Sequence, residues 1–541
     1  MGVLRFQNIF FRSFLGSSGT TQALFIFLLI PCCLTQEFRA PPFIPGVSFL
    51  WGWNAPTELC AKRFNVQLDL NLFSLIGSPL KGVIGQGIAL FYSDRLGYYP
   101  HINKTTGKIV NGGIPQLGSL KKHLDKAKKD ISHYIETDSV GLAVIDWDCW
   151  RPNWERNWRP KHIYKEQSID LAQQQHIHLN LTEVTKIAKA DFEKAGKCFM
   201  QETLKLGKFL RPNYLWGFYL YPDCYNYNYK SPNYNGSCFD IEQRRNDEIN
   251  WLWKESTALF PSIYLNSKLK SSPFAALYVR NRVLEAIRVS KVKNVKHPLP
   301  IFVYARPVFT DVLLKYLTEE DLVNTIGESV SLGVSGMVMW GSLNLTQNVQ
   351  ICTELDAYIK NKLNPYIINV TLAAKMCSQV LCQDQGVCIR KHWNSNDYLH
   401  LNPVNFAIQL ERSGRYTVQG KPTLEDLQLF SKKFYCACYA NTQCKERVDL
   451  TDIHTVKVCV GEDVCIDVYL NSVPSGHPSD WKGKYVTSSN IFSAMPPPAT
   501  GPPCVPGRDL NRCLKARFIV EDNSKTTQTG YQSIHIKNKK Q

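Results

Sequence analysis

Two acidic residues follow an apolar run in the stretch GLAVIDWDCWRPNWERNW, which spans residues 141–158. Asp146 and Asp148 stand two residues apart, so on an extended strand their side chains would project from one face. Two neighbouring carboxyl groups walled by tryptophans cannot both ionise at low cost, and one should keep its proton near neutral pH. Such a pair suits acid–base cleavage of a glycosidic bond. The alternatives are two solvated aspartates or a metal site, although no histidine lies nearby.

The segments that must position this pair alternate between short apolar runs and longer amphipathic stretches, from about residue 49 to residue 363. The predicted strands are Phe49–Trp53, Ile88–Tyr92, Gly141–Asp146, Leu215–Leu220, Ser262–Leu265, Pro300–Tyr304 and Gly336–Trp340. The predicted helices are Leu120–Tyr134, Glu183–Leu206, Glu242–Leu259, Leu277–Ser290 and Glu319–Leu332. This alternation predicts an α/β fold with parallel strands. Seven or eight units favour a closed (β/α) barrel, whose active site lies at the strand C-termini, over a doubly wound open sheet.

The cysteine spacing changes after Asn369. A C-x4-C-x5-C group and a later C-x-C-x5-C group are typical of an epidermal-growth-factor-like (EGF-like) module that carries an insertion. The predicted pairs are Cys377–Cys388, Cys382–Cys436 and Cys438–Cys444, although spacing alone does not fix connectivity. A proline-rich tail follows this module, and we expect Cys504 and Cys513 to pair within it.

The N-terminus predicts export. Arg5, Arg12 and the apolar run Ala23–Leu34 are typical of a signal peptide cleaved near Thr35, with a retained signal-anchor as the alternative. Of the 18 cysteines, 16 follow this segment, and an even set in an exported chain indicates disulfides rather than zinc ligands. Predicted glycosylation sites are Asn103, Asn180, Asn235, Asn344 and Asn369. We expect neither a transmembrane helix nor a C-terminal lipid-anchor signal.

The net charge favours an acidic partner. The formal charge of +17 falls to about +15 without Arg5 and Arg12, which suits nucleic acid, an anionic membrane or an acidic polysaccharide. Export argues against nucleic acid, which leaves an anionic membrane and an acidic polysaccharide as candidate partners. We expect no metal and no cofactor.

Several long segments resemble the mammalian hyaluronidases, most closely the sperm-surface type. They are DWD-x-W at 146–150, LWGFYLYPDCYNYNY at 215–229, WLWKESTALFPSIYL at 251–265, YVRNRVLEAIRVS at 278–290 and SGMVMWGS at 335–342. The resemblance runs from about residue 40 to residue 470. It implies a distorted, TIM-like barrel of seven strands and the bridges Cys60–Cys352, Cys224–Cys238 and Cys459–Cys465. Cys149 and Cys198 have no evident place in that bridge set, so they either pair with each other or stay as buried thiols.

The family resemblance also implies an activity and the residues that carry it. Hyaluronidases cleave the β-1,4 bonds of hyaluronan with retention and use the N-acetyl group of the substrate as nucleophile. In their DWE-x-W pattern the Glu donates the proton, and its place is taken here by Asp148. Asp146 matches the residue that orients the acetamide, and Tyr219 matches a tyrosine that hydrogen-bonds it.

Three further residues are expected to bind the sugar chain. Tyr264 in PSIY and Trp340 in MVMW match residues that line the cleft of the family. We infer from its position in YVRNRV that Arg282 could meet a glucuronate carboxylate.

The aspartate at position 148 separates two hypotheses of function. Asp is one methylene shorter than Glu, so we expect weak cleavage of hyaluronan, with chondroitin as a second substrate. The rival hypothesis is a non-catalytic hyaluronan-binding or gamete-adhesion protein that contacts egg-coat glycoproteins. A third, a growth-factor-like ligand, has little support from the module spacing.

The predicted organisation is a signal peptide (1–35), a barrel domain (36–370), the EGF-like module (371–470) and a disordered tail (471–541). We expect a monomer in the secretory pathway. The resemblance places it outside the cell, on the sperm surface or in the acrosome.

Overall fold

The computed structural model of the chain describes residues 36–103, 105–461 and 463–470. The predicted signal peptide, the proline-rich tail and the Cys504–Cys513 pair lie outside these residues. Within them, no helix has both the length and the apolar character needed to cross a membrane.

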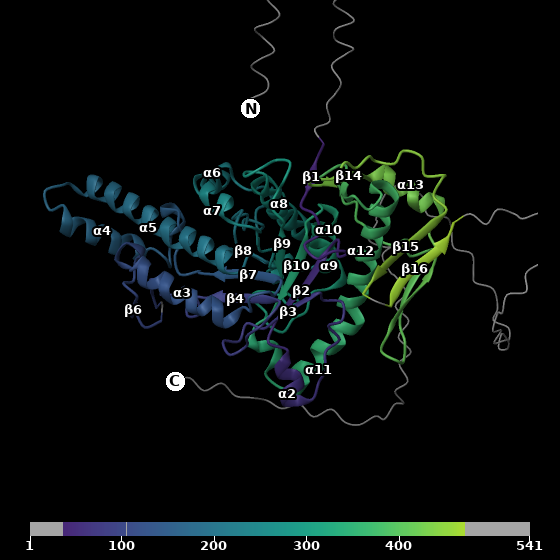
Figure 1. Cartoon of the computed structure of the whole chain (residues 1–541), viewed down its shortest axis with the longest axis horizontal. Helices are drawn as coiled ribbons and strands as arrows, with labels where there is room; N and C mark the ends of the chain where they lie inside the picture. The colour runs from purple at the N-terminus through teal and green to yellow at the C-terminus, as the bar shows by residue number, and fades with distance from the viewer. Residues whose placement is uncertain (1–35, 104, 462, 471–541) are drawn as a thin grey trace, which may run out of the picture.

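Parallel strands occupy the middle of the molecule, and helices surround them (Figure 1). The strands are β2 (Leu50–Asn54), β3 (Leu75–Gly77), β4 (Ile88–Tyr92), β7 (Gly141–Asp146), β8 (Tyr214–Phe218), β9 (Phe302–Ala305) and β10 (Gly336–Trp340). They form two parallel sheets, ordered β3-β2-β10-β9 and β4-β7-β8. The predicted α/β class with parallel strands is confirmed.

A segment between β8 and β9 links the two sheets without forming a strand. Isolated parallel bridges join Tyr219 to Phe260, Leu259 to Ile301 and Ser262 to Tyr304. The prediction of a strand at Ser262–Leu265 is therefore wrong. Pro261 provides the reason, because it has no N–H to donate and interrupts the ladder at this point.

At their other edges the two sheets come together at a glycine. A Cβ atom placed on Gly77 of β3 would lie only 2.3 Å from the carbonyl oxygen of Ile88 on β4. Glycine permits this close backbone approach, which a side chain would block. The sequence did not predict β3, because a three-residue strand carries too little periodicity to be recognised.

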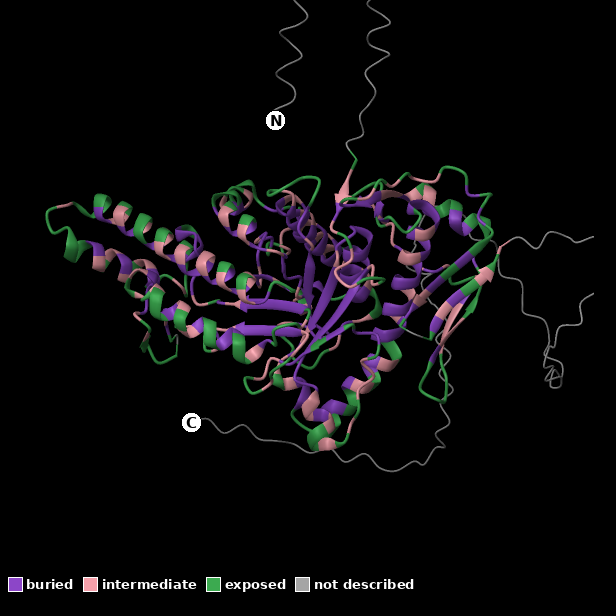
Figure 2. Cartoon of the chain, viewed as in Figure 1, coloured by how far each residue is buried: buried purple, intermediate pink, exposed green. Residues whose placement is uncertain are grey.

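Alternate residues of the strands face two different cores. One set packs together in an inner cluster of eleven buried residues, which includes Leu142 and Val144 of β7. The other set, with Ala143 and Ile145, packs against the helices. Figure 2 shows the strands buried, whereas the surrounding helices expose one face to solvent. A strand buried on both faces explains why these segments are almost continuously apolar.

The helices around the strands are α2 (Glu58–Phe64), α3 (Leu120–Tyr134), α4 (Ile163–Gln175), α5 (Leu181–Leu210), α6 (Asp240–Glu248), α7 (Asn250–Glu255), α8 (Pro273–Ser290), α9 (Glu319–Leu322), α10 (Glu328–Ser331) and α11 (Val349–Tyr358). Of these, α3 and α5 are amphipathic, as predicted, whereas α10 is buried along its whole length. The longest, α5, begins with a capping box between Asn180 and Glu183. The predicted helix Glu242–Leu259 is instead two helices, α6 and α7, and ends at Glu255.

The C-terminal part packs on the outside of the strands. Its elements are α12 (Asn364–Cys377), β11 (Gly386–Arg390), β12 (Phe406–Leu410), β13 (Tyr416–Gly420), α13 (Leu424–Lys433), β14 (Phe434–Tyr439), β15 (Thr455–Val460) and β16 (Val464–Tyr469). The N-terminal strand β1 (Phe38–Arg39) pairs with β14, so the start of the described chain joins the C-terminal part. Two short strands between β4 and α3, β5 (His101–Ile102) and β6 (Ile109–Val110), pair with each other in an antiparallel arrangement. Helix α12 continues across residue 370, where the sequence predicts a domain boundary.

The disulfide bonds confirm the expected pairing. The structure contains Cys60–Cys352, Cys224–Cys238, Cys377–Cys388, Cys382–Cys436, Cys438–Cys444 and Cys459–Cys465. The first closes a loop of 292 residues and ties α2 to α11.

The predicted glycosylation sites differ in exposure. Asn103, Asn180 and Asn235 are exposed, whereas Asn344 and Asn369 are half-buried. The side chain of Asn369 accepts a hydrogen bond from the backbone of Leu401 at 3.1 Å. Glycosylation at all five remains a prediction.

Candidate active site

The candidate site lies where the inner faces of the strands end. Asp146 is in register with Leu142 and Val144, the residues of β7 that belong to the inner cluster. Tyr92 at the end of β4 and Trp340 at the end of β10 pack against the same cluster. Strand periodicity thus aims these three side chains at one place above the inner cluster.

Asp146 has a strongly perturbed acidity. Burial raises the pKa of its carboxyl group from 3.8 to about 7, and the neighbouring Asp148 adds to the shift. Arg151 and Lys161 act in the opposite direction and offset part of it. At neutral pH this carboxyl group is therefore close to half protonated, which matches the expectation that one member of the pair keeps a proton.

Asp148 lies on the solvent side of the same site. Asp146 and Asp148 both line a hollow of about 360 Å³, together with Tyr92 and Cys149. The Asp148 side chain is 56% exposed, and its Oδ1 is 2.5 Å from Arg151 Nη2 and 3.4 Å from Lys161 Nζ. The two acids thus share one hollow but differ in environment: one is half-buried, and the other is exposed and contacted by two cations.

The residue between the two acids turns the other way and anchors the chain. Trp147 is buried in the outer core, where its ring stacks on Tyr99 with centroids 4.6 Å apart. Trp150 is also buried and donates a hydrogen bond to the Pro100 carbonyl at 2.8 Å. These tryptophans form core rather than a sugar-binding surface.

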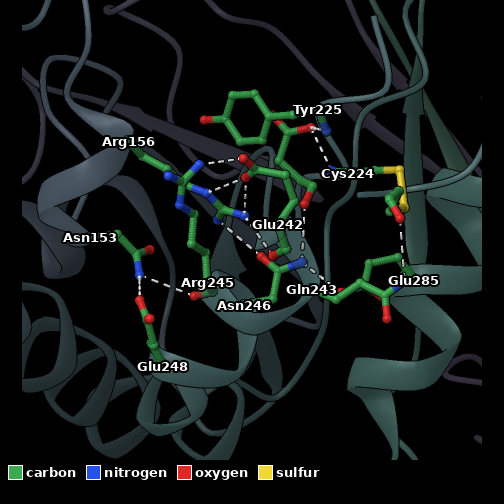
Figure 3. Close-up of polar contacts among 12 residues, drawn as sticks. Asn153, Arg156, Cys224, Tyr225, Glu242, Gln243, Arg245, Asn246, Glu248 and Glu285 are labelled. Atoms are coloured by element: carbon green, nitrogen blue, oxygen red, sulfur yellow. Dashed lines mark hydrogen bonds and ion pairs between the residues drawn. A yellow bond between two sulfur atoms is a disulfide. The ribbon is translucent and has the colours of Figure 1, made fainter. Parts of the chain in front are cut away.

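A buried polar network holds the loop that follows Asp148 (Figure 3). Arg156 donates to Glu242 of α6 at 3.1 and 3.0 Å, and to the Asn246 side chain at 2.9 Å. Asn246 in turn donates to Glu285 of α8 at 2.6 Å. The short 3₁₀ helix that carries Arg156 is thereby fixed to two helices, and this limits the movement of the loop bearing Asp148.

Tyrosines form the wall opposite the acids. Tyr219, which follows β8, donates a hydrogen bond to Ser262 at 3.2 Å, and its ring lies 5.9 Å from that of Tyr264. Burial and the charge of Asp146 raise the pKa of Tyr219, so its hydroxyl stays protonated and can donate. Burial raises the pKa of Tyr92 to about 12, with Asp146 again contributing.

Two predicted residues of the cleft stand together. Tyr264 and Trp340 stack with their ring centroids 6.0 Å apart. Trp340 Nε1 donates to the Tyr92 hydroxyl at 3.2 Å, which connects this aromatic pair to the acidic side of the site.

Arg282 does not reach the site. It is 2% exposed, forms an ion pair with buried Asp223 at 3.0 Å, and donates to the Asn226 side chain and the Ser262 carbonyl. Its proposed contact with a glucuronate is therefore corrected: the guanidinium is already used to hold the chain around Asp223. Helix α8 presents this residue to the protein interior, and the sequence motif gave no sign of that orientation.

The cation that does lie at the aromatic pair is Arg306, which lies in none of the sequence motifs considered above. Its guanidinium carbon is 5.0 Å from the Trp340 ring centroid and 5.6 Å from that of Tyr264. Arg306 continues the inner-face register of Phe302 and Tyr304 in β9. The two-residue spacing that selected Asp146 and Asp148 would have found it.

Cys149 and Cys198 form no disulfide in the described structure, so the pairing hypothesis is wrong. Cys149 lines the hollow of the two acids, whereas Cys198 lines a separate hollow between α4 and α5. The hypothesis assumed that strand alternation continues to residue 149. Because β7 ends at Asp146, that alternation does not direct Cys149 toward the helices.

No group of three or more His, Cys, Asp or Glu side chains among the described residues is arranged to hold a metal ion.

Comparison with known proteins identifies relatives along most of the chain. The family described as hyaluronidase matches residues 38–448. Hyaluronidase PH-20 of Homo sapiens is 63% identical over 87% of this chain and 92% of its own, and Hyaluronidase-5 of Mus musculus is 61% identical over 97% and 99%. A crystal structure of bee venom hyaluronidase in complex with a hyaluronic acid tetramer aligns with a TM-score of 0.53 at 30% identity, over 59% of this chain and 98% of that one.

Proposed function

Because this chain belongs to the hyaluronidase family, we propose that it is a glycoside hydrolase that cleaves the β-1,4 bonds of hyaluronan. The observation that carries the proposal is the arrangement of Asp146 and Asp148, which line one hollow at the end of β7 beside an aromatic wall. A pair of carboxyl groups in different environments is what acid–base cleavage of a glycosidic bond needs.

The proposed roles follow the environment of each group. Asp148, at the solvent side of the hollow, protonates the leaving glycosidic oxygen. Asp146 and Tyr219 orient the acetamide of the substrate, whose carbonyl oxygen attacks the anomeric carbon from within the sugar. The raised pKa of Asp146 supports this role, because a partly protonated carboxyl group can both donate to and accept from an amide. Tyr264 and Trp340 offer flat surfaces to the sugar rings.

The aspartate at position 148 supports a second candidate, a hyaluronan-binding or gamete-adhesion protein without turnover. A carboxyl group one methylene too short, and already in contact with Arg151 and Lys161, would be a poor proton donor to a distant oxygen. Binding surfaces formed by the aromatic residues would be unaffected. Of the two candidates we propose weak hydrolysis of hyaluronan as the main function, with chondroitin as a second substrate.

One pair of assays separates the two candidates. A hyaluronan zymogram detects cleavage, and retention on immobilised hyaluronan detects binding. Cleavage that Asp148→Asn abolishes supports the hydrolase. Retention without cleavage, in wild type and variant alike, supports the binding protein. Absence of both overturns the proposal.

We also propose that the strands close into a distorted barrel. The bridges through residues 259–262 and the approach of Gly77 to Ile88 support closure on both sides. The three bridges among Cys377, Cys382, Cys388, Cys436, Cys438 and Cys444 support an EGF-like module that packs on this domain. We further propose that the protein is secreted as a monomer. It would lie on the sperm surface or in the acrosome and contact egg-coat glycoproteins.

A further inference from the structure

Arg306 is a buried cation without an acidic partner among the described residues. It is 9% exposed, and its Nε atom makes no hydrogen bond. Several other buried arginines do contact a carboxylate, for example Arg156 with Glu242 and Arg280 with Glu328. A buried charge that no opposite charge compensates is costly for a folded protein. A ligand that carries the missing anion would remove this cost.

The position of Arg306 shows where that ligand would lie. The residue follows β9 on its inner face, and its guanidinium group rests against Tyr264 and Trp340. Trp340 is hydrogen-bonded to Tyr92, whose hydroxyl feels the charge of Asp146. The unpaired cation therefore belongs to the rim of the same site as the acids, two side chains away from Asp146.

Two flat rings beside a guanidinium group define the chemistry of the ligand. Aromatic faces contact the apolar faces of sugar rings, and a guanidinium group binds a carboxylate through parallel hydrogen bonds. A polymer in which an amino sugar alternates with a uronic acid offers an acetamide for the Asp146 side and a carboxylate for the Arg306 side.

Resting on the function proposed above, we propose that Arg306, Tyr264 and Trp340 form a subsite for a uronate residue of the substrate. The guanidinium group binds the uronate carboxylate, and the two rings hold the sugar. The subsite makes the enzyme select an anionic polymer over a neutral one of the same shape.

The test compares native hyaluronan with hyaluronan whose carboxyl groups have been reduced to primary alcohols. Dissociation constants for oligosaccharides of both polymers are measured on wild type, Arg306→Gln and Arg306→Lys. We expect Arg306→Gln to weaken binding of the native oligosaccharide about tenfold or more, because a hydrogen-bonded charge is lost. Binding of the reduced oligosaccharide should stay the same. Arg306→Lys should recover part of the loss.

Lys315→Gln is the matched control. Lys315 lies over the ring of Phe309, on the same connection after β9, but outside the rim of the site. The control removes one positive charge and should leave both affinities unchanged. If it weakens native hyaluronan as much as Arg306→Gln does, the effect is net charge and the subsite is overturned.

Thermal melting of the free protein separates an effect on folding from an effect on glycan binding. Without glycan, Arg306→Gln should melt at the wild-type temperature or higher, since it removes an uncompensated charge; a lower value would indicate a structural role and overturn the proposal. Equal affinity of the wild type for native and reduced oligosaccharides would also overturn the subsite, while hydrolysis could still stand. Selective binding without any cleavage would instead remove the hydrolase function and support the subsite.

Discussion

Lengthening the side chain at position 148 should raise turnover. The carboxyl group of Asp148 lies against Arg151 at 2.5 Å and Lys161 at 3.4 Å, at the edge of a hollow of about 360 Å³ that leaves space for one more methylene. One C–C bond is about 1.5 Å, so Asp148→Glu extends the reach by about 1–1.5 Å. A misplacement of about 1 Å can cost about 100-fold in rate, or about 2.7 kcal/mol in the barrier. We therefore expect at least a tenfold increase in kcat.

The assay is the release of reducing ends from hyaluronan, with kcat and KM measured at acid and at neutral pH. Asp148→Asn should lose cleavage, because an amide side chain cannot act as the proton donor. Asp146→Glu is the matched control: it adds the same methylene to the other acid, which is half-buried at the end of β7, and should lower kcat by displacing the acetamide. Thermal melting of each variant verifies that the fold is kept.

An equal or lower kcat for a folded Asp148→Glu variant would refute the reasoning. The limit on turnover would then lie elsewhere, and the proton donor would not be the residue at position 148.

Three further changes test the stability of the site and the fold. Burial raises the pKa of Asp146 from 3.8 to about 7, so the wild-type protein loses folding stability as the pH rises through this window. Asp146→Asn lacks this loss, and between pH 4 and pH 8 it should gain about 2–4 kcal/mol of stability relative to wild type. The difference in Tm between the two proteins should therefore grow with pH, and a constant difference would contradict the prediction. Arg156→Met removes one of the two arginines that contact buried Glu242 and should cost about 1–3 kcal/mol in chemical denaturation, whereas Lys205→Met in an exposed pair should change stability far less; similar costs would speak against the buried network. Replacing both Cys60 and Cys352 by Ala opens a 292-residue loop and should cost about 3–5 kcal/mol, so an unchanged Tm would rule out a stabilising bridge.

Local sequence pattern was enough to predict the strands that are buried on both faces and the helices that bury one face. A strand such as Gly141–Asp146 is apolar at nearly every position, and a helix such as Leu120–Tyr134 repeats its buried residues with a helical period. Both signals are written along a single segment. The period of two also predicted that Asp146 and Asp148 would face the same hollow.

Contacts between distant segments decided the rest. The motif that contains Arg282 cannot show that Asp223 lies 3.0 Å away and takes up its charge. Nor can a sequence show that Arg306 meets two aromatic rings from different segments and no carboxylate.

The difference in environment between the two aspartates is also decided by the tertiary structure. By their spacing alone the two aspartates are equivalent, and that spacing predicts only that one of them keeps a proton. In the fold, burial raises the pKa of Asp146, whereas Asp148 is exposed and lies beside two cations. A spacing of two residues at the end of one strand brought two carboxyl groups to one hollow; desolvation and neighbouring charge, which only packing creates, determined how they differ.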